Sequence, residues 1–140
     1  MNEVIVSKSI NAPAKKVWEK LSSFRGIENF SPIERSVTQG EGPGATRTCY
    51  LPDGAAIHEV LDIVENDNME FQYKITDGPF PVENYVSTVK VSAKSENITT
   101  VTWGCTFESS KEVKEEMENL FSGFYNVIID SLETLINSEN

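Results

Sequence analysis

Residues 109–136 read SSKEVKEEMENLFSGFYNVIIDSLETLI. Apolar side chains recur here at three- and four-residue spacing, which predicts one broad apolar stripe on a helix of roughly 25 residues. The predicted stripe consists of Val113, Met117, Leu120, Phe121, Phe124, Val127, Ile128, Leu132, Leu135 and Ile136. Ser109, followed three residues later by Glu112, predicts a capping box at the start of the helix. Such a helix needs a large apolar surface against which its stripe can be buried.

The chain before this helix is predicted to supply that surface as a sheet. Period-two patterns bounded by turn residues predict strands at residues 3–10, 36–41, 46–51, 56–65, 69–76, 85–94 and 98–107. From residue 36 onward the connections are too short for parallel crossovers, so the strands form an antiparallel meander.

Two short helices are expected between the first and second strands. Pro13 suits the first position of a helix that continues through Val17, Trp18 and Leu21. A further helical turn at residues 27–30 is expected to end before Pro32, because the residue before proline avoids the α region. The sequence therefore predicts an α+β fold in which a curved antiparallel sheet of about seven strands wraps around the long C-terminal helix.

Length and composition narrow the possible functions. A chain of 140 residues is expected to form a single domain, residues 1–140. The formal charge of −10 repels phosphate backbones, so nucleic acid is not an expected partner. No apolar run approaches the roughly 20 residues needed to span a bilayer, so membrane insertion is not expected. Residues 1–10 do not resemble a signal peptide, and a cytoplasmic location is therefore expected.

The cysteines and the histidine do not suggest catalysis or metal binding. Cys49 and Cys105 each lie in an apolar run and lack the close spacing of a structural zinc site, so both are expected to be free and buried. His58 has no sequence signature that ties it to either thiol. We therefore expect no metal, no cofactor and no nucleophilic cysteine.

Several short motifs follow one another along the predicted strands. They are GATR at 44–47, DG at 53–54, IHEVL at 57–61, YKI at 73–75, GPFPV at 78–82 leading into Tyr85, and VTW at 101–103. Their order and spacing resemble the Bet v 1-like or START-like (SRPBCC) superfamily, in particular its polyketide cyclase/dehydrase and lipid-transport group. The resemblance covers essentially the whole chain. It implies a helix-grip fold with an apolar cavity that binds a small hydrophobic, lipid- or polyketide-like molecule.

The same region is more distantly similar to the plant abscisic acid receptors. The shared pieces are TR at 46–47, LP at 51–52, EVLDI at 59–63 and NYVS at 84–87. This chain departs from the receptors at FPV, residues 80–82, where their latch carries His-Arg-Leu, and its turn after Leu51 is shorter than their gate. From this resemblance we expect a ligand pocket in this chain, but we do not expect it to bind the hormone.

Strand alternation places Ile57, Glu59, Leu61 and Ile63 on one face, which the resemblance points into the cavity. A carboxylate among apolar side chains is costly unless it is paired, so we predict an ion pair between Glu59 and Arg47. This pair either contacts the ligand or satisfies only itself at the cavity wall. His58 is expected on the opposite, outer face.

The remaining candidate ligand contacts are mostly aromatic. The strands supply Tyr73, Tyr85, Ser87 and Trp103, and the long helix supplies Met117, Phe121 and Phe124. Each of these residues serves either ligand contact or core packing. Phe80 lies between two prolines in a stiff loop and is predicted to be an exposed lid over the cavity mouth, the alternative being a turn with one incidental aromatic.

Three functions follow from these expectations. The first is binding or transport of a small hydrophobic molecule, because the sequence offers a cavity wall but no complete set of acid, base and nucleophile. The second is a polyketide cyclase or dehydratase in which Glu59 or Tyr85 moves protons. The third is a protein-interaction module resembling the activators of the Hsp90 chaperone, with the acidic cluster at Glu112, Glu115, Glu116 and Glu118 as its contact surface.

Overall fold

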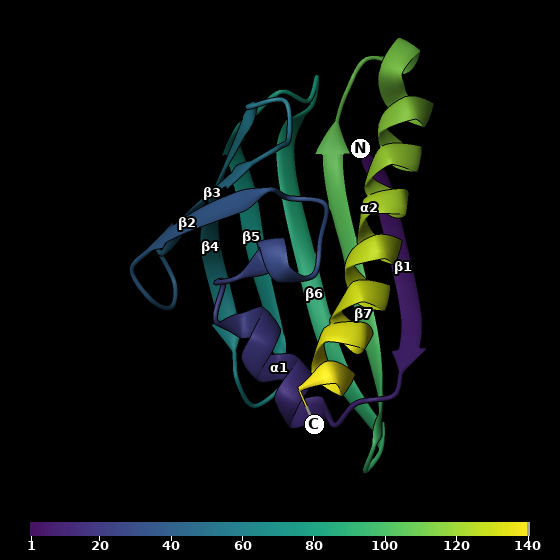
Figure 1. The fold of residues 1–140 in the computed structure, drawn as a ribbon. Coiled ribbons are helices and arrows are strands. Elements are labelled where there is room, and N and C mark those ends of the chain that lie inside the picture. Colours follow the sequence, from purple (N-terminus) through teal and green to yellow (C-terminus); the bar gives the residue numbers. More distant parts are fainter. Residues whose placement is uncertain (140) are drawn as a thin grey trace.

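A computed structural model describes residues 1–139 and contains one antiparallel sheet (Figure 1). Its strands are β1 (Asn2–Ile10), β2 (Arg35–Gln39), β3 (Thr46–Tyr50), β4 (Ala56–Glu65), β5 (Glu70–Asp77), β6 (Glu83–Ser95) and β7 (Ile98–Glu108). They lie in the order β1-β7-β6-β5-β4-β3-β2, so each strand from β2 to β6 pairs with the next one along the chain. The predicted meander is confirmed, and β1 extends it by pairing with β7.

Three helical segments accompany the sheet. They are α1 (Ala14–Ser22), the 3-10 helix η1 (Ile27–Asn29) and α2 (Lys111–Ser138). The second predicted short helix is therefore only one 3-10 turn. In Figure 1, α2 runs along the sheet beside β1 and β7, and α1 lies near its C-terminal end. Within residues 1–139, no helix is both long enough and apolar enough to cross a bilayer.

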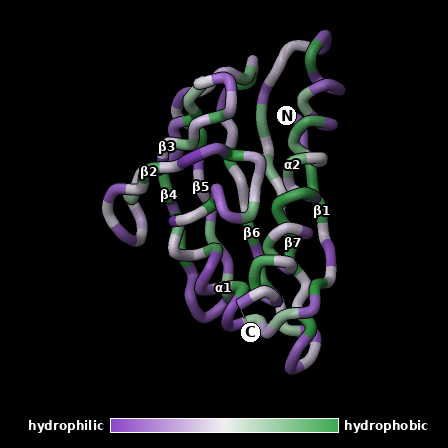
Figure 2. Tube along the Cα trace, viewed as in Figure 1, coloured by the Kyte–Doolittle hydropathy of each residue, from purple (hydrophilic) through white to green (hydrophobic). Residues whose placement is uncertain are grey.

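Alternation along the strands separates a buried face from an exposed one. Figure 2 shows hydrophobic and hydrophilic residues interspersed along the strands. In β1, Val4 and Val6 are buried whereas Ile5 is 62% exposed. The inward residues of β5, β6 and β7 join those of α1 and α2 in the hydrophobic core. The expected α+β helix-grip architecture is confirmed.

The start of α2 differs from the prediction. The N-cap residue is Ser110, and its side chain makes no capping hydrogen bond, so the predicted capping box at Ser109 is wrong. Ser109 has other partners: its Oγ accepts a hydrogen bond from Asn2 Nδ2 at 2.9 Å and donates to the carbonyl oxygen of Ser110 at 3.1 Å.

The buried positions of α2 also differ from the predicted apolar stripe. Leu120 and Val127 are 44% and 45% exposed, so their assignment to the buried stripe is wrong. At 3.6 residues per turn, both fall outside the arc centred on the residues that contact the sheet. The buried positions are Met117, Phe121, Tyr125, Ile128, Ile129, Leu132 and Ile136, of which Tyr125 and Ile129 were not predicted.

A bulge in β4 reverses one predicted orientation. Leu61 pairs with Tyr73, but the pairing with β5 shifts by one residue before Ile63, which pairs with Gln72. An extra residue in one strand changes which side chains face inward beyond it. Ile63 is therefore 43% exposed, contrary to the prediction, and Val64 packs against the core instead.

This reversal predicts that Leu61 and Ile63 differ sharply in how much each side chain contributes to the free energy of unfolding. Leu61→Ala should lower the free energy of unfolding by about 2–5 kcal/mol, because it empties a fully buried site. Ile63→Ala should change it by less than about 0.5 kcal/mol, because that side chain lies at the surface. Urea unfolding of both variants measures the difference, and equal losses would contradict the register described for β4.

Candidate functional site

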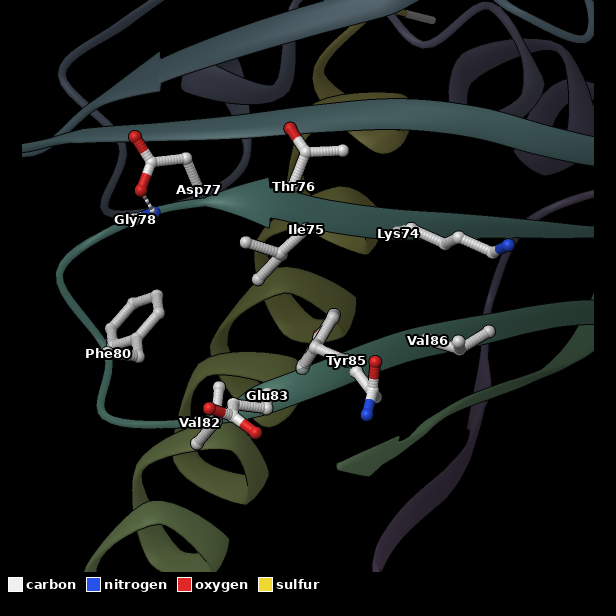
Figure 3. Close-up of a pocket in the computed structure, with 11 residues that line it drawn as sticks. Lys74, Ile75, Thr76, Asp77, Gly78, Phe80, Val82, Glu83, Tyr85 and Val86 are labelled. Carbon is white, nitrogen blue, oxygen red and sulfur yellow. Dashed lines mark hydrogen bonds between the residues drawn. The ribbon is translucent and has the colours of Figure 1, made fainter. Parts of the chain in front are cut away.

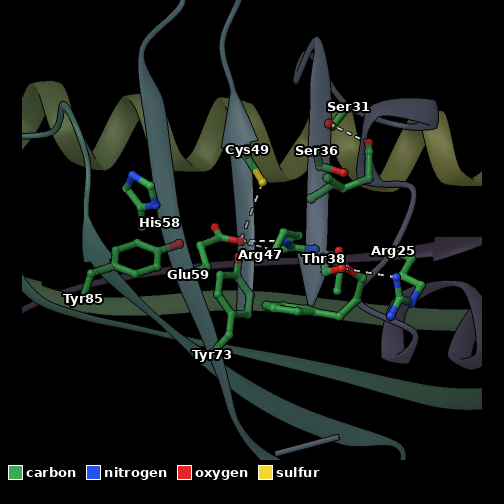
Figure 4. Close-up of polar contacts among 12 residues, drawn as sticks. Arg25, Ser31, Ser36, Thr38, Arg47, Cys49, His58, Glu59, Tyr73 and Tyr85 are labelled. Carbon is green, nitrogen blue, oxygen red and sulfur yellow. Dashed lines mark hydrogen bonds and ion pairs between the residues drawn. The ribbon is translucent and has the colours of Figure 1, made fainter. Parts of the chain in front are cut away.

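The predicted ion pair joins β3 to β4. Arg47 and Glu59 are cross-strand neighbours, and the Nε and Nη2 atoms of Arg47 each lie 2.6 Å from Glu59 Oε1 (Figure 4). The two side chains are only 5% and 8% exposed. The prediction is confirmed, and its physical basis is that neither charge is tolerated alone in this position.

Aromatic rings enclose the Arg47 guanidinium. Its central carbon lies 3.8 Å from the centroid of the Phe24 ring and 5.4 Å from that of Tyr73. Burial, the largest single influence, lowers the pKa of Arg47, but the attraction of Glu59, its hydrogen bond and smaller contributions from other neighbours together raise it, so the side chain stays cationic. Phe24 adopts a left-handed backbone with φ of 61°, which sequence periodicity gave no means of anticipating.

The cysteines are free and buried, as predicted. The Cys49 thiol donates a hydrogen bond to Glu59 Oε1 at 3.8 Å. Burial, reinforced by the negative charge of Glu59, raises the pKa of Cys49 to about 12, and burial raises that of Cys105 to about 11. Both thiols are therefore protonated at neutral pH and are poor nucleophiles. His58 is exposed on the outer face of the sheet, also as predicted.

Aromatic side chains occupy the space between the sheet and α2 where the family resemblance implies a cavity. The ring centroids of Tyr73 and Trp103 lie 6.4 Å apart, those of Trp103 and Tyr125 5.7 Å, and those of Tyr85 and Phe121 5.2 Å. Trp103 Nε1 donates a hydrogen bond to the Tyr73 hydroxyl at 3.2 Å. These rings contact one another directly, so a ligand in this space must displace side chains.

The other predicted contacts lie around this cluster. Ser87 is fully buried and donates a hydrogen bond to the Gly104 carbonyl oxygen at 2.8 Å. Met117 is buried on α2, and Phe124 is half-buried on the same helix. The structure thus places the predicted strand residues on the inward face, and Tyr125 joins them from a helix position that the sequence analysis omitted.

Strands β5 and β6 separate at one end of the sheet. Their last paired residues are Lys74 and Val86, although β5 continues to Asp77 and β6 begins at Glu83. The pairing of β6 with β7 is irregular between Glu83 and Val86, and Asn84 has a positive φ of 53°. We call the resulting opening between residues 75–77 and 83–85 the β5–β6 gap.

The β5–β6 gap contains a pocket of about 520 Å³ (Figure 3). Its apolar lining comes from Ile75, Phe80, Val82, Tyr85 and Val86. Its polar lining comes from Lys74, Thr76, Asp77, Glu83 and Asn84, with the backbone of Gly78 between them. The pocket therefore combines a hydrophobic surface with a polar rim, as small-molecule sites commonly do.

Phe80 lies at the edge of this pocket, in the loop that connects β5 to β6. Its ring centroid is 5.5 Å from that of Phe121 in an edge-on arrangement, and the side chain is half-buried. The prediction of an exposed Phe80 without a partner is wrong, because Phe121 of α2 is its partner. Phe80 also lines a second pocket, of about 440 Å³, beside Ser109 and Ser110.

A sheet that grips a long C-terminal helix, with short helical segments after the first strand, defines the helix-grip class of α+β proteins. The sequence profile described as "Polyketide cyclase / dehydrase and lipid transport" matches residues 1–137, so the chain belongs to this family. Family and fold together support a ligand-binding role in general terms. A search of the curated proteins found no match.

Solved structures with this fold include two from Bacillus. The protein XoxI from Bacillus cereus is 30% identical, with a TM-score of 0.87 over 97% of this chain and 96% of that one. An uncharacterised protein from Bacillus thuringiensis is 28% identical, with a TM-score of 0.86 over 96% of this chain and 98% of that one.

A plant enzyme shares the fold at much lower identity. Norcoclaurine synthase from Thalictrum flavum, solved in complex with dopamine and hydroxybenzaldehyde, is 15% identical, with a TM-score of 0.80 over 99% of this chain and 88% of that one. At this identity the similarity concerns the fold alone.

The buried ion pair generates a prediction about stability. Arg47→Met leaves the Glu59 carboxylate buried without a partner and should lower the free energy of unfolding by about 3–5 kcal/mol. Adding Glu59→Gln removes the unpaired charge and should recover part of that loss. A double-mutant cycle measured by urea unfolding should give a coupling energy of at least about 0.5 kcal/mol. Additive effects of the two substitutions would refute the pairing.

Proposed function

We propose that this protein binds a small, largely apolar molecule that enters between sheet and helix through the β5–β6 gap. The observation that carries this proposal is the pocket of about 520 Å³ at that gap. Its size falls within the range of roughly 300–1,000 Å³ typical of small-molecule sites. Family membership is consistent with the same general role.

The route inward passes Phe80. The ring of Phe80 packs against Phe121, and the ring of Tyr85 packs against the same Phe121 at 5.2 Å. Movement of Phe80 away from α2 would uncover Phe121 and let a ligand pack against it. Pro79 and Pro81 restrict the loop on either side, so Phe80 is proposed to move with a stiff loop as a lid.

The predicted contacts divide into those at this entrance and those elsewhere in the interior. Phe80 and Tyr85 line the entrance and would meet the ligand first, together with Phe121. The other proposed contacts, which do not line this pocket, are Tyr73, Ser87, Trp103, Met117, Phe124 and the Arg47–Glu59 pair.

We favour ligand binding over catalysis because neither candidate for proton transfer, Glu59 or Tyr85, is placed to act as a general base. Glu59 is held by the Arg47 guanidinium. Burial, followed by the neighbouring Tyr125, raises the pKa of Tyr85 well above its ordinary value, so its hydroxyl stays protonated. A cyclase or dehydratase needs a group that accepts a proton near neutral pH.

The protein-interaction alternative has less support. Glu112, Glu115 and Glu116 are exposed on α2, as a solvated helix face would be. Among residues 1–139, this acidic face coincides with none of the pockets described above. We therefore place the function in the β5–β6 gap and the interior behind it.

The neutral dye N-phenyl-1-naphthylamine, which fluoresces in apolar surroundings, tests this proposal. The native protein should bind it at one site, and binding should raise the melting temperature. Phe80→Ser should speed dye release several-fold, while the free energy of unfolding falls by only about 1 kcal/mol through loss of the ring contact with Phe121. Stopped-flow fluorescence and urea unfolding measure the two effects.

Two matched variants control this experiment. Val82→Trp fills the pocket and should weaken dye binding. Ile5→Ser removes an apolar side chain that is 62% exposed on the outer face and should leave binding unchanged. The proposal fails if the native protein does not bind the dye. The lid fails if Phe80→Ser costs about 3 kcal/mol or more without changing the release rate, as expected of a core aromatic.

A further inference from the structure

Two tyrosine hydroxyls meet in the core next to the proposed entrance. Tyr85 of β6 and Tyr125 of α2 are hydrogen-bonded through their hydroxyl oxygens, and the two residues are only 4% and 1% exposed. Of these two residues, only Tyr85 was predicted from the sequence to contact a ligand. The pairing depends on the helix position of Tyr125, which brings the two phenols together across the space between sheet and helix.

The surroundings of this hydroxyl pair are rich in donors. The Cys105 thiol is also buried and lies close enough to both hydroxyls to affect its own pKa. Each of these three groups carries one hydrogen, and sulfur is only a weak acceptor. Burial raises the pKa of both tyrosines well above the ordinary value, so both remain donors. Only one of the two phenolic hydrogens is used in the bond between the hydroxyls, so the other can be donated to an oxygen acceptor on a ligand.

The hydroxyl pair is also within reach of a ligand that enters through the gap. Tyr85 lines the pocket at the β5–β6 gap. Phe121, the ring that Phe80 covers, lies 5.2 Å from Tyr85 and 6.4 Å from Tyr125 between centroids. A molecule that takes the place of Phe80 would therefore pack against a ring, Phe121, that neighbours both tyrosine rings.

We propose that the hydroxyls of Tyr85 and Tyr125 form the polar subsite of the ligand site and select an apolar molecule with one uncharged oxygen acceptor, such as a ketone carbonyl. This inference rests on the function proposed above. A carbonyl oxygen has two lone pairs, so it accepts one hydrogen bond from each tyrosine when their mutual bond opens. A carboxylate is excluded by its desolvation cost, because the buried cation of the described chain, Arg47, is already paired with Glu59.

Two probes of nearly equal shape test the subsite: 2-acetylnaphthalene, which has the carbonyl, and 2-isopropylnaphthalene, which lacks it. The wild-type protein should bind the ketone more tightly than the hydrocarbon. Tyr85→Phe and Tyr125→Phe should each weaken ketone binding about 3- to 10-fold and leave hydrocarbon binding unchanged. Calorimetric titration measures both affinities, and Tyr50→Phe, which removes a hydroxyl from β3, is the matched control.

Infrared spectroscopy gives a second measurement, and its deciding result comes from the wild-type protein alone. The probe is 2-acetylnaphthalene with a ¹³C-labelled carbonyl, measured both bound to the protein and dissolved in hexane. The carbonyl stretching band of the bound probe should lie at lower wavenumber than that of the same labelled probe in hexane, because two phenols donate hydrogen bonds to the oxygen. In each Tyr→Phe variant the band should move back toward its position in hexane. A band at the hexane position in the wild-type complex would overturn the inference.

The binding outcomes separate this inference from the function on which it rests. If the hydrocarbon binds and the ketone has no advantage, the subsite is wrong and the proposed function stands. If the Tyr→Phe variants weaken both probes equally, the hydroxyl pair serves packing alone and the subsite is again wrong. If neither probe binds, the function and the subsite fail together.

Discussion

The long helix α2 can bury its apolar side only against the concave face of the sheet, and aromatic rings make that contact. Phe121 and Tyr125 of the helix pack among Tyr85, Trp103 and Phe107 of the strands, with ring centroids 5.2 to 6.4 Å apart. Large flat rings each bury a wide area, so a few of them fill the space between a curved sheet and a helix. Under the proposed function a flat, apolar ligand would separate the same rings, so the packing of this core and its proposed function would depend on the same residues.

Polar groups inside the core restrict what this interior can accept. The Arg47 and Glu59 charges satisfy one another, and Phe24 covers the guanidinium. The tyrosines contribute neutral donors instead of charges. An interior of this kind disfavours ionic ligands, because desolvating a further charge would cost several kcal/mol without a free partner to offset it. Most of the acidic side chains behind the net charge of −10 lie on the surface, and two of them, Asp77 and Glu83, line the pocket at the gap.

Periodicity predicted the elements and most of their inward faces. The alternation that points Arg47 and Glu59 into the core was sufficient to predict their ion pair, because a buried carboxylate needs a cation. Local hydrogen bonding was not predictable in this way. The bulge before Ile63 depends on strand pairing, and Ser109 is hydrogen-bonded to Asn2, which lies far away in sequence, instead of capping α2.

The site was predicted less completely than the fold. Tyrosine is compatible with either a buried or an exposed helix position, so the pattern gave no reason to place Tyr125 beside Tyr85. The β5–β6 gap depends on where strand pairing ends and on the positive φ of Asn84, neither of which alternation encodes. Phe80 was expected to have no partner because its contact, Phe121, lies on an element 41 residues away, and only the packing of α2 brings them together.

The most direct test of the central claim, that the interior opens at the β5–β6 gap, is methyl NMR of the isoleucine and valine side chains during titration with N-phenyl-1-naphthylamine. The methyl resonances of Ile75 and Val82, which line the gap, should shift in proportion to the bound fraction. Those of Ile5 and Ile63, which are exposed away from it, should not shift. Shifts confined to Ile5 and Ile63, or no shifts while the dye is bound, would contradict entry and binding at the gap.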